Sequence, residues 1–411
     1  MNRKWLIFAV CSSLFLMSLF YRASSAIIAP QLMKDLKLTH EDLGLLGAAF
    51  FYTFALVQFP LGPVLDRLGP RITMAGLNLL ATLGAIVFAR AGSMAGGVLG
   101  RGLLGLGMAA NLMGPLKLFT IWFPPNRFAT MSGLLLSLGT LGSLAATSPL
   151  AVMVEALGWR GSFYTLAAVN VLLVLFIIII VRDTPEGHGV QLADNQRTSV
   201  SPWLGALKLV FSSWSYWAIS LSAFIRYGSY VAIQALWAGP FLMEYLRLPT
   251  ITAGNLLFLL SLGFIIGSPC GGLLSDDLLK SRKKTVILGS TLSAFLAASF
   301  SLWKAPVHIL LLGTVFFSLG FFSSFGQVIY AHIKELMPSE MSASAMTAVN
   351  FFTMMGGGVF IHMLGSIMQR FGGAAAHEGH AYSVAFLVCA AGYSIATMLY
   401  FTTKESQAKS P

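Results

Sequence analysis

The sequence predicts an all-α integral membrane protein whose twelve transmembrane helices form two pseudo-symmetric six-helix bundles. Hydrophobic residues make up 56% of the 411 residues and charged residues only 10%, and the mean hydropathy is +0.77. The apolar runs are about 20 residues long, which matches a hydrocarbon core about 30 Å thick. The third observation is an internal repeat with an offset of 210 positions. A water-soluble domain would not need this many long apolar runs.

The repeat is clearest in a short polar turn between two apolar runs. The offset places Gly62 on Gly272 and Asp66 on Asp276. Six further positions pair without a gap: Pro30 with Pro240, Leu32 with Leu242, Met33 with Met243, Leu36 with Leu246, Leu38 with Leu248 and Gly44 with Gly254. Such a match indicates that about half of the chain has been duplicated.

Taken in order, the apolar runs place the helices near residues 5–29, 42–64, 71–90, 94–120, 128–153, 160–182, 213–240, 252–275, 284–303, 306–331, 342–368 and 382–403. The first run, which follows basic residues, could also be a secretory signal peptide. Its repeat copy lies in the middle of the chain, so we expect helix 1 to be retained. Residues 183–212 are the only long polar stretch and predict a flexible linker. The predicted domains are therefore 1–182, a linker at 183–212, and 213–411 with a short tail.

The distribution of basic residues predicts the orientation. Sixteen of the 26 Lys and Arg residues fall on the side of both termini and the linker, and eight, Arg101 among them, fall on the other side. By the positive-inside rule, both termini and the linker are cytoplasmic. We expect a multi-pass protein of the cell membrane, which in a bacterium is the inner membrane.

Several function classes find no support in the sequence. Cys11, Cys270 and Cys389 all lie in apolar runs, which gives no sign of a disulfide framework or a metal site. The net charge of +11 comes from basic residues at the ends of apolar segments, so nucleic acid is not an expected partner. No nucleophile with a base, metal-ligand set or nucleotide-binding glycine motif is visible. We therefore predict no enzyme activity, no catalytic residues, no cofactor and no bound metal.

Two of the 26 basic residues are assigned to neither side of the membrane. They are Arg22 and Arg226, which lie within predicted helices. A charge inside the membrane is costly, so it usually faces a wet cavity or a partner. All fifteen acidic residues fall in loops or at helix ends. A cavity with fixed positive charge favours an anion, since guanidinium binds carboxylate or phosphate through two hydrogen bonds. Alternatively, Arg22 extends toward the membrane surface, and Arg226 satisfies backbone carbonyls.

The polar turn carries a family resemblance. Gly62, Asp66, Arg67, Gly69 and Arg71 resemble the G-x-x-x-D-R-x-G-x-R signature of the major facilitator superfamily, with a weaker copy at Gly272 and Asp276. Arg101 with Gly105 and Gly107 also resembles the superfamily's helix 4 motif. The resemblance implies two six-helix bundles around a central cavity, alternating access and a monomer. It also implies a gating role for the turn, in which Asp66 caps a neighbouring helix and holds Arg67 or Arg71 when the cytoplasmic side is closed.

A partial resemblance concerns the two arginines. Arg22 with Pro30 eight positions later is similar to helix 1 of the organophosphate:phosphate antiporters and the anion:cation symporters. Arg226-Tyr227-Gly228 resembles helix 7 of the organophosphate antiporters. The resemblance implies that both arginines bind the substrate. We expect an anion bound by both arginines, from the two halves, to draw the bundles together and drive the switch.

Polar residues of lower rank also fall within the predicted helices. Those that could line a cavity are Tyr52, Asn111, Tyr227, Tyr230, Gln234, Gln327 and Asn350. The spacing of Tyr227, Tyr230 and Gln234 predicts one shared helix face. The alternative is that such residues bridge neighbouring helices, as is equally expected for Asn78, Asn170 and Asn255. His362 is a candidate for proton coupling, or a hydrogen-bonded residue of the bundle.

Together these features predict a secondary active or facilitative transporter of a small organic anion, either a carboxylate or a phosphorylated compound. Coupling to protons, to a counter-anion or to neither remains open. The alternatives are a transporter of a neutral, zwitterionic or metal-chelate solute with structural arginines, and a membrane sensor that does not transport.

Overall fold

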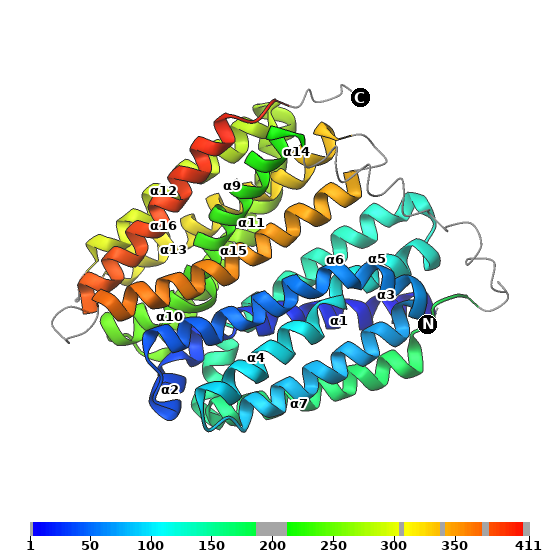
Figure 1. Ribbon diagram of the computed structural model, residues 1–411, viewed down its shortest axis with the longest axis horizontal. Helices are drawn as coiled ribbons and strands as arrows, with labels where there is room; N and C mark the ends of the chain where they lie inside the picture. The colour runs from blue at the N-terminus through cyan, green and yellow to red at the C-terminus, as the bar shows by residue number, and fades with distance from the viewer. Residues whose placement is uncertain (1–2, 186–211, 304–307, 338–341, 372–377, 406–411) are drawn as a thin grey trace. The chain divides into compact units, whose positions relative to one another are not determined.

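The computed structural model describes residues 3–185, 212–303, 308–337, 342–371 and 378–405, and these residues are almost wholly helical (Figure 1). Within these described ranges, nine helices are long and apolar enough to cross a membrane. The all-α membrane fold predicted from composition is confirmed. The predicted linker lies largely outside the described residues.

Helix 1 is interrupted near its end. The segment expected as one helix near 5–29 forms α1 (Arg3–Ala23) and α2 (Ser25–Leu36), with Ser24 between them. The side-chain oxygen of Ser24 donates a hydrogen bond to the carbonyl of Tyr21 at 3.0 Å. A hydroxyl that bonds a carbonyl three residues earlier competes with the helical backbone pattern. The break places Arg22 beside the last turn of α1.

Predicted helices 2 and 3 form the single long element α3 (His40–Ala89), which bends at Gly69. It begins with a capping box, in which Thr39 and Asp42 each accept a backbone N–H of the other. Gly69 has φ of 79°, a region that residues with a Cβ rarely adopt. The polar turn predicted from the sequence is therefore a kink at Gly69 that separates two helices within α3.

Predicted helices 4 to 6 form α4 (Met94–Met108), α5 (Ala110–Trp122), α6 (Pro125–Ala145) and α7 (Ser148–Ile180). Predicted helix 5 is broken after Ala145, and its last part continues into helix 6 across Gly158, whose φ is 69°. The outer face of α7 is apolar: Ile179 is 68% exposed and Leu172 53%. Exposed aliphatic side chains on a helix of this length are typical of a lipid-facing surface.

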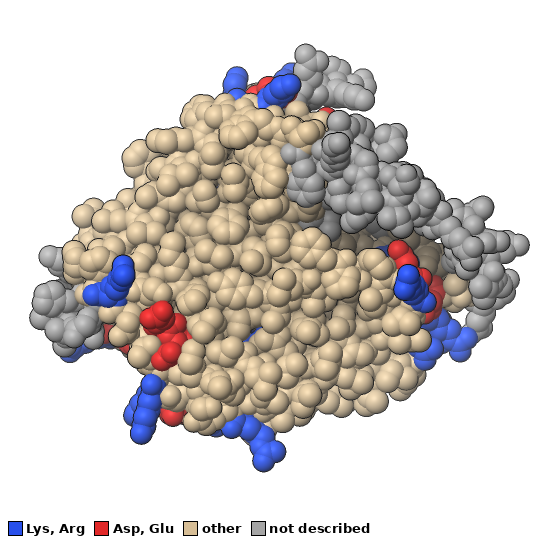
Figure 2. Space-filling model, in the orientation of Figure 1, with Lys and Arg blue, Asp and Glu red and all other residues tan. Residues whose placement is uncertain are grey.

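The second half of the chain is also helical, with several irregular turns. Its elements are α9 (Trp214–Ala232), η1 (Ile233–Trp237), α10 (Ala238–Pro240), η2 (Phe241–Tyr245), α11 (Thr250–Leu273), η3 (Leu274–Leu278), α12 (Arg282–Ser299), η4 (Phe300–Leu302), α13 (Ile309–Ser324), η5 (Phe325–Val328), α14 (Ile329–Leu336), α15 (Ser342–Phe371) and α16 (Glu378–Phe401). The π-helical turns η1 and η2 flank Pro240, which cannot donate a backbone hydrogen bond. The face visible in Figure 2 is largely free of charged side chains.

The chain forms two compact units. Unit 1 comprises Met1–Gly189, Gln234–Phe258 and Ile361–Gln369, and unit 2 comprises Val190–Ile233, Leu259–Phe360 and Arg370–Pro411. Parts of predicted helices 7, 8 and 11 therefore belong to unit 1. Within that unit, the Trp237 indole donates to the carbonyl of Ile361 at 3.0 Å. The domain boundaries expected at 182 and 213 stay a prediction.

Candidate functional site

Arg22 occupies a half-buried position in unit 1, one residue before the end of α1. Its guanidinium carbon lies 5.0 Å from the centre of the Phe54 ring on α3, and Phe54 itself is buried. An aromatic face attracts a cation through its quadrupole, and the attraction increases away from water. The contact therefore gives the charged group a defined place inside the helical bundle.

Arg226 is almost fully buried in unit 2, with 3% of its surface exposed. Its two terminal nitrogens donate to the carbonyls of Ser323, at 2.9 Å, and Gly326, at 3.1 Å. These carbonyls lie where α13 ends and the 3₁₀ turn η5 begins, so the change in helical pattern makes them available. A Cβ at position 326 would lie 1.8 Å from the Arg226 guanidinium carbon. In this structure Arg226 satisfies backbone carbonyls, the second of the two roles considered from the sequence.

A network of hydroxyl groups extends from this contact within unit 2. The Ser323 hydroxyl lies 2.9 Å from that of Tyr393 and 3.1 Å from that of Ser293. Tyr330 donates to the side-chain carbonyl of Asn350 at 3.1 Å. Asn350, which is predicted to line a cavity, is half-buried and accepts this hydrogen bond from Tyr330.

The shared face predicted on helix 7 stays a prediction. Tyr230 is buried, and its ring is stacked with that of Phe264 at 5.0 Å between centres, whereas Tyr227 and Gln234 are half-buried. The spacing argument assumes α-helical geometry, but the chain becomes π-helical at Ile233. Gln234 lies in this π-helical turn and belongs to unit 1.

Asn111 occupies a different environment from the predicted cavity wall. It is fully buried, donates to the carbonyl of Leu14 at 3.2 Å and accepts from Asn78 at 2.8 Å. Asn170 donates to the carbonyl of Asn78, also at 2.8 Å. These amides join α1, α3, α5 and α7 in unit 1. Asn111 therefore bridges helices in this structure, as expected of Asn78 and Asn170.

The remaining candidates are half-buried side chains on separate elements. Tyr52 lies on α3, Gln327 in η5, and His362 on the part of α15 that belongs to unit 1. Asn255 accepts a hydrogen bond from Ser148 at 2.8 Å and bridges helices within unit 1. Tyr52 and Gln327 are partly exposed, and their role as cavity residues stays a prediction.

The first polar turn has partners other than those predicted. Asp66 forms an ion pair with Lys117 at 2.6 Å, and the same lysine donates to the Leu65 carbonyl. The backbone N–H of Arg71 is instead capped by Asp183, at 2.8 Å. The gating role expected of Asp66 concerns the state in which the cytoplasmic side is closed, and it stays a prediction. Asp183 takes the capping role because Gly69 lets its carboxylate approach the bend.

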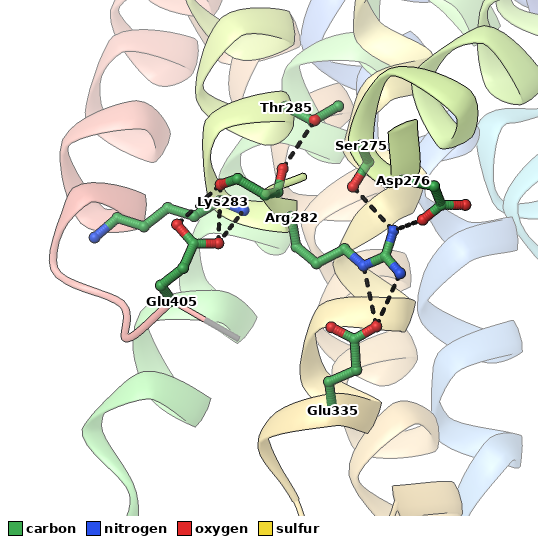
Figure 3. Close-up of polar contacts among 8 residues, drawn as sticks. Ser275, Asp276, Arg282, Lys283, Thr285, Glu335 and Glu405 are labelled. Atoms are coloured by element: carbon green, nitrogen blue, oxygen red, sulfur yellow. Dashed lines mark hydrogen bonds and ion pairs between the residues drawn. The ribbon is translucent and has the colours of Figure 1, made fainter. Parts of the chain in front are cut away.

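The second polar turn forms a denser network (Figure 3). Arg282 contacts Asp276 and Ser275, and two of its nitrogens donate to Glu335 at 3.0 and 2.9 Å. Glu405 accepts the Ser281 hydroxyl at 2.9 Å and the Lys283 backbone N–H at 3.4 Å. Glu405 thus resembles Asp183. Each of them follows the last helix of its half and accepts a backbone N–H near the start of the third helix of that half.

Sequence reasoning missed Asp183, Glu335 and Glu405, although their positions at helix ends on the side of both termini could have indicated them. It also counted Arg101 among the basic residues of the outer side, although the helix predicted near 94–120 contains this residue. Arg101 lies in α4 and is fully buried. The match of Arg101 to the helix 4 motif was the signal in the sequence that could have placed it within that helix.

Comparison with known proteins agrees with this architecture. The sequence profile described as Major Facilitator Superfamily matches residues 10–360 and 219–411. The chain is 24% identical to the probable sulfoacetate transporter SauU of Cupriavidus necator over 67% of its length and 66% of that protein. It is 23% identical to a probable hexose phosphate transport protein of Chlamydia trachomatis, over 93% of this chain and 87% of that protein.

A solved structure shares the fold over nearly the whole chain. It is a bacterial homologue of the human lysosomal transporter Spinster, in an inward-facing and unoccupied conformation. The match has a TM-score of 0.82 at 15% identity and covers 98% of this chain and 97% of that one. With the profile match over both halves and the signature at Gly62–Arg71, the chain belongs to the Major Facilitator Superfamily of membrane transporters.

Proposed function

We propose that this transporter moves a small organic anion by alternating access, and that Arg22 binds the anionic group. The substrate is a carboxylate or a phosphorylated compound. The observation that carries the proposal is the half-buried Arg22 guanidinium over the Phe54 ring, at an interruption of helix 1. The relatives named for sulfoacetate and for hexose phosphate, whose oxyanions a guanidinium can bind in the same way, support it.

The chemistry of the guanidinium supports binding and selectivity. Its N–H groups lie in one plane and match two oxygens of a carboxylate, sulfonate or phosphate. Partial exposure leaves Arg22 accessible, and the apolar ring beneath it lowers the local dielectric, which strengthens a charge-assisted hydrogen bond. A cation would be repelled at this position, and a neutral solute would not offset the desolvation of the arginine.

Arg226 is the second residue predicted to bind the anion, and it can do so only if its present hydrogen bonds change. To bind a substrate, its guanidinium must exchange at least one of the carbonyls of Ser323 and Gly326 for the anion. Tyr52, Tyr227, Gln234, Gln327 and Asn350 are half-buried and are proposed as further cavity residues. Tyr230 is proposed as a packing residue beside them.

Coupling, location and assembly complete the proposal. We propose exchange or facilitated movement, since no acidic residue lies within the predicted spans, with a counter-anion as the exchanged partner. A proton-coupled mechanism would depend on His362, and His362→Ala would then remove the pH dependence of uptake. The protein acts as a monomer in a bacterial inner membrane with both termini in the cytoplasm. The distribution of Lys and Arg supports this orientation.

A second candidate function is transport of a neutral, zwitterionic or metal-chelate solute with structural arginines. The hydrogen bonds from Arg226 to two backbone carbonyls favour it, because they show an arginine in a structural role. In that case neutral compounds, and not anions, stabilise the protein.

Thermal stabilisation of the purified protein tests both candidates, because a ligand that binds the folded state raises the Tm. The panel comprises sulfoacetate, D-galactonate, glucose 6-phosphate, neutral sugars, amino acids and cations. We expect stabilisation by an anion, and an affinity about 10- to 100-fold weaker in Arg22→Ala, the effect of losing a charged hydrogen bond. The control is Arg90→Ala, which removes an exposed arginine at the end of α3. Unchanged affinity in Arg22→Ala would refute the assignment.

A further inference from the structure

Arg101 is a buried arginine without a role in the proposal so far. It lies in α4 with none of its surface exposed, and one terminal nitrogen donates to the carbonyl of Tyr21 at 2.9 Å. Among the residues that the structure describes, its Nε and its other terminal nitrogen have no hydrogen-bond partner. A buried charge with two unsatisfied donors is unfavourable for stability. Its presence therefore calls for a functional reason.

The Tyr21 carbonyl ties Arg101 to the backbone of Arg22. The Tyr21 carbonyl accepts two side-chain hydrogen bonds, one from Arg101 and one from the Ser24 hydroxyl. The peptide unit is planar, so the carbonyl of Tyr21 and the nitrogen of Arg22 move together. Arg101 thus holds the peptide group from which Arg22 extends.

A pair of aromatic rings forms a second link between the two arginines. The Arg101 guanidinium carbon lies 5.2 Å from the centre of the Phe50 ring. Phe50 and Phe54, one turn apart on α3, are stacked with 6.0 Å between centres and 20° between planes. Arg22 lies over Phe54 at 5.0 Å. Both rings are buried, and each of them has one guanidinium in contact with it.

We propose that Arg101 is a positioning residue for Arg22, and this rests on the proposed function, in which Arg22 binds the anion. Arg101 holds the Tyr21–Arg22 peptide at the break in helix 1, and it holds the Phe50–Phe54 stack against which the Arg22 guanidinium lies. A guanidinium held in place loses less conformational freedom when it binds a ligand, which raises affinity. The unsatisfied donors of Arg101 add fixed positive charge near the same site.

A double-mutant cycle tests the coupling, because residues that act through one another give non-additive effects. Dissociation constants for sulfoacetate, D-galactonate and glucose 6-phosphate are measured by calorimetry on the full-length protein and on Arg22→Ala, Arg101→Met and the double variant. We expect Arg101→Met alone to weaken binding of the preferred anion about tenfold or more. In the Arg22→Ala background, the same change should alter affinity less than about twofold. Arg101→Lys, which retains a donor and the charge, should restore part of the loss.

The control for general destabilisation is Asn170→Leu, which removes buried hydrogen bonds to α3. It should lower the Tm as Arg101→Met does, yet leave the dissociation constants unchanged. If Arg22→Ala and Arg101→Met weaken binding equally and their effects on the dissociation constant add in the double variant, the inference fails while the proposed function stands. If none of the three anions binds, or if Arg22→Ala binds them normally, the proposed function fails and the inference fails with it.

A spectroscopic measurement tests the same link without any ligand. With arginine Nε labelled by ¹⁵N, the Arg22 signal is identified by its loss in Arg22→Ala. The Phe54 ring shifts this signal, because a nucleus over an aromatic ring experiences its ring current. We expect the signal to move in Arg101→Met and to stay in place in Asn170→Leu. An unmoved signal in Arg101→Met would contradict the positioning role.

Discussion

At the scale of single residues, the arginines inside this transporter differ in what they contact. Arg22 lies over an aromatic ring, Arg101 bonds one carbonyl, and Arg226 bonds two. The contact of Arg226 depends on the absence of a side chain at Gly326. Burial alone therefore does not distinguish a substrate residue from a structural one. The proposal that Arg22 binds the substrate therefore rests on the atoms that its guanidinium contacts.

Gly326→Ala tests the structural role of Arg226. The added Cβ would lie 1.8 Å from the guanidinium carbon, so the side chain must leave at least one carbonyl. Loss of a charged hydrogen bond in a buried site destabilises by about 1–3 kcal/mol. We expect a lower Tm in detergent than for Gly76→Ala, the control, where nothing lies within 4 Å of the new Cβ. Equal stability of the two variants would show that Arg226 does not need these carbonyls.

At the scale of elements, the helices are less regular than their hydropathy predicts. Helix 1 breaks at Ser24, helices 2 and 3 join across Gly69, and helix 7 becomes π-helical on both sides of Pro240. The bend at Gly69 exposes the first N–H groups of the third helix, which a carboxylate then caps. Asp183 does this in the first half, and Glu405 bonds the corresponding region of the second.

Asp183→Ala and Asp66→Ala compare two carboxylates near this bend. Asp183 accepts a backbone N–H at the start of a helix, a charge-assisted bond whose loss we expect to cost about 1–3 kcal/mol. Asp66 pairs with Lys117, but its side chain is 74% exposed, so its loss should cost about 0–1 kcal/mol. Thermal unfolding of the two variants provides the comparison. A larger loss in Asp66→Ala would reverse the assignment of the cap.

At the scale of the whole molecule, charge and hydropathy define the position in the membrane. The apolar outer faces account for the exposed aliphatic side chains of α3 and α7. In the predicted topology, Lys and Arg residues concentrate on the side of both termini, and the two polar turns fall on that same side. Both turns should therefore face the cytoplasm, and the loop that joins α3 to α4 should face the opposite side.

Single cysteines test this orientation in a protein whose three native cysteines are replaced by alanine. Gly92→Cys lies in the loop after α3, where nothing is within 4 Å of the added atom, and Asp277→Cys lies in the second polar turn. Both positions are exposed. An impermeant maleimide should label position 92 in intact cells and position 277 only in inside-out vesicles. The reverse pattern would place both termini outside the cytoplasm.

The sequence by itself determined the fold class, the succession of apolar segments and the duplicated polar turn. Hydrophobic length and the repeat are local properties of the chain, so they can be read without its tertiary structure. The candidate site was determined only in part: Arg22 and Arg226 were found because a charge in an apolar run is visible. Their different contacts were not visible, because that of Arg22 depends on the packing of Phe54 and those of Arg226 depend on carbonyls at the junction of α13 and η5.

The tertiary structure alone decided the depth of Arg101, the bridging role of Asn111 and the cap supplied by Asp183. Each depends on which face of one helix meets another, often across 80 or more positions of sequence, as in the bond from Arg101 to Tyr21. Hydropathy places a residue along a helix but does not say which neighbour it faces. The physical reason is that a hydrogen bond requires two groups within about 3 Å, and only packing brings them together.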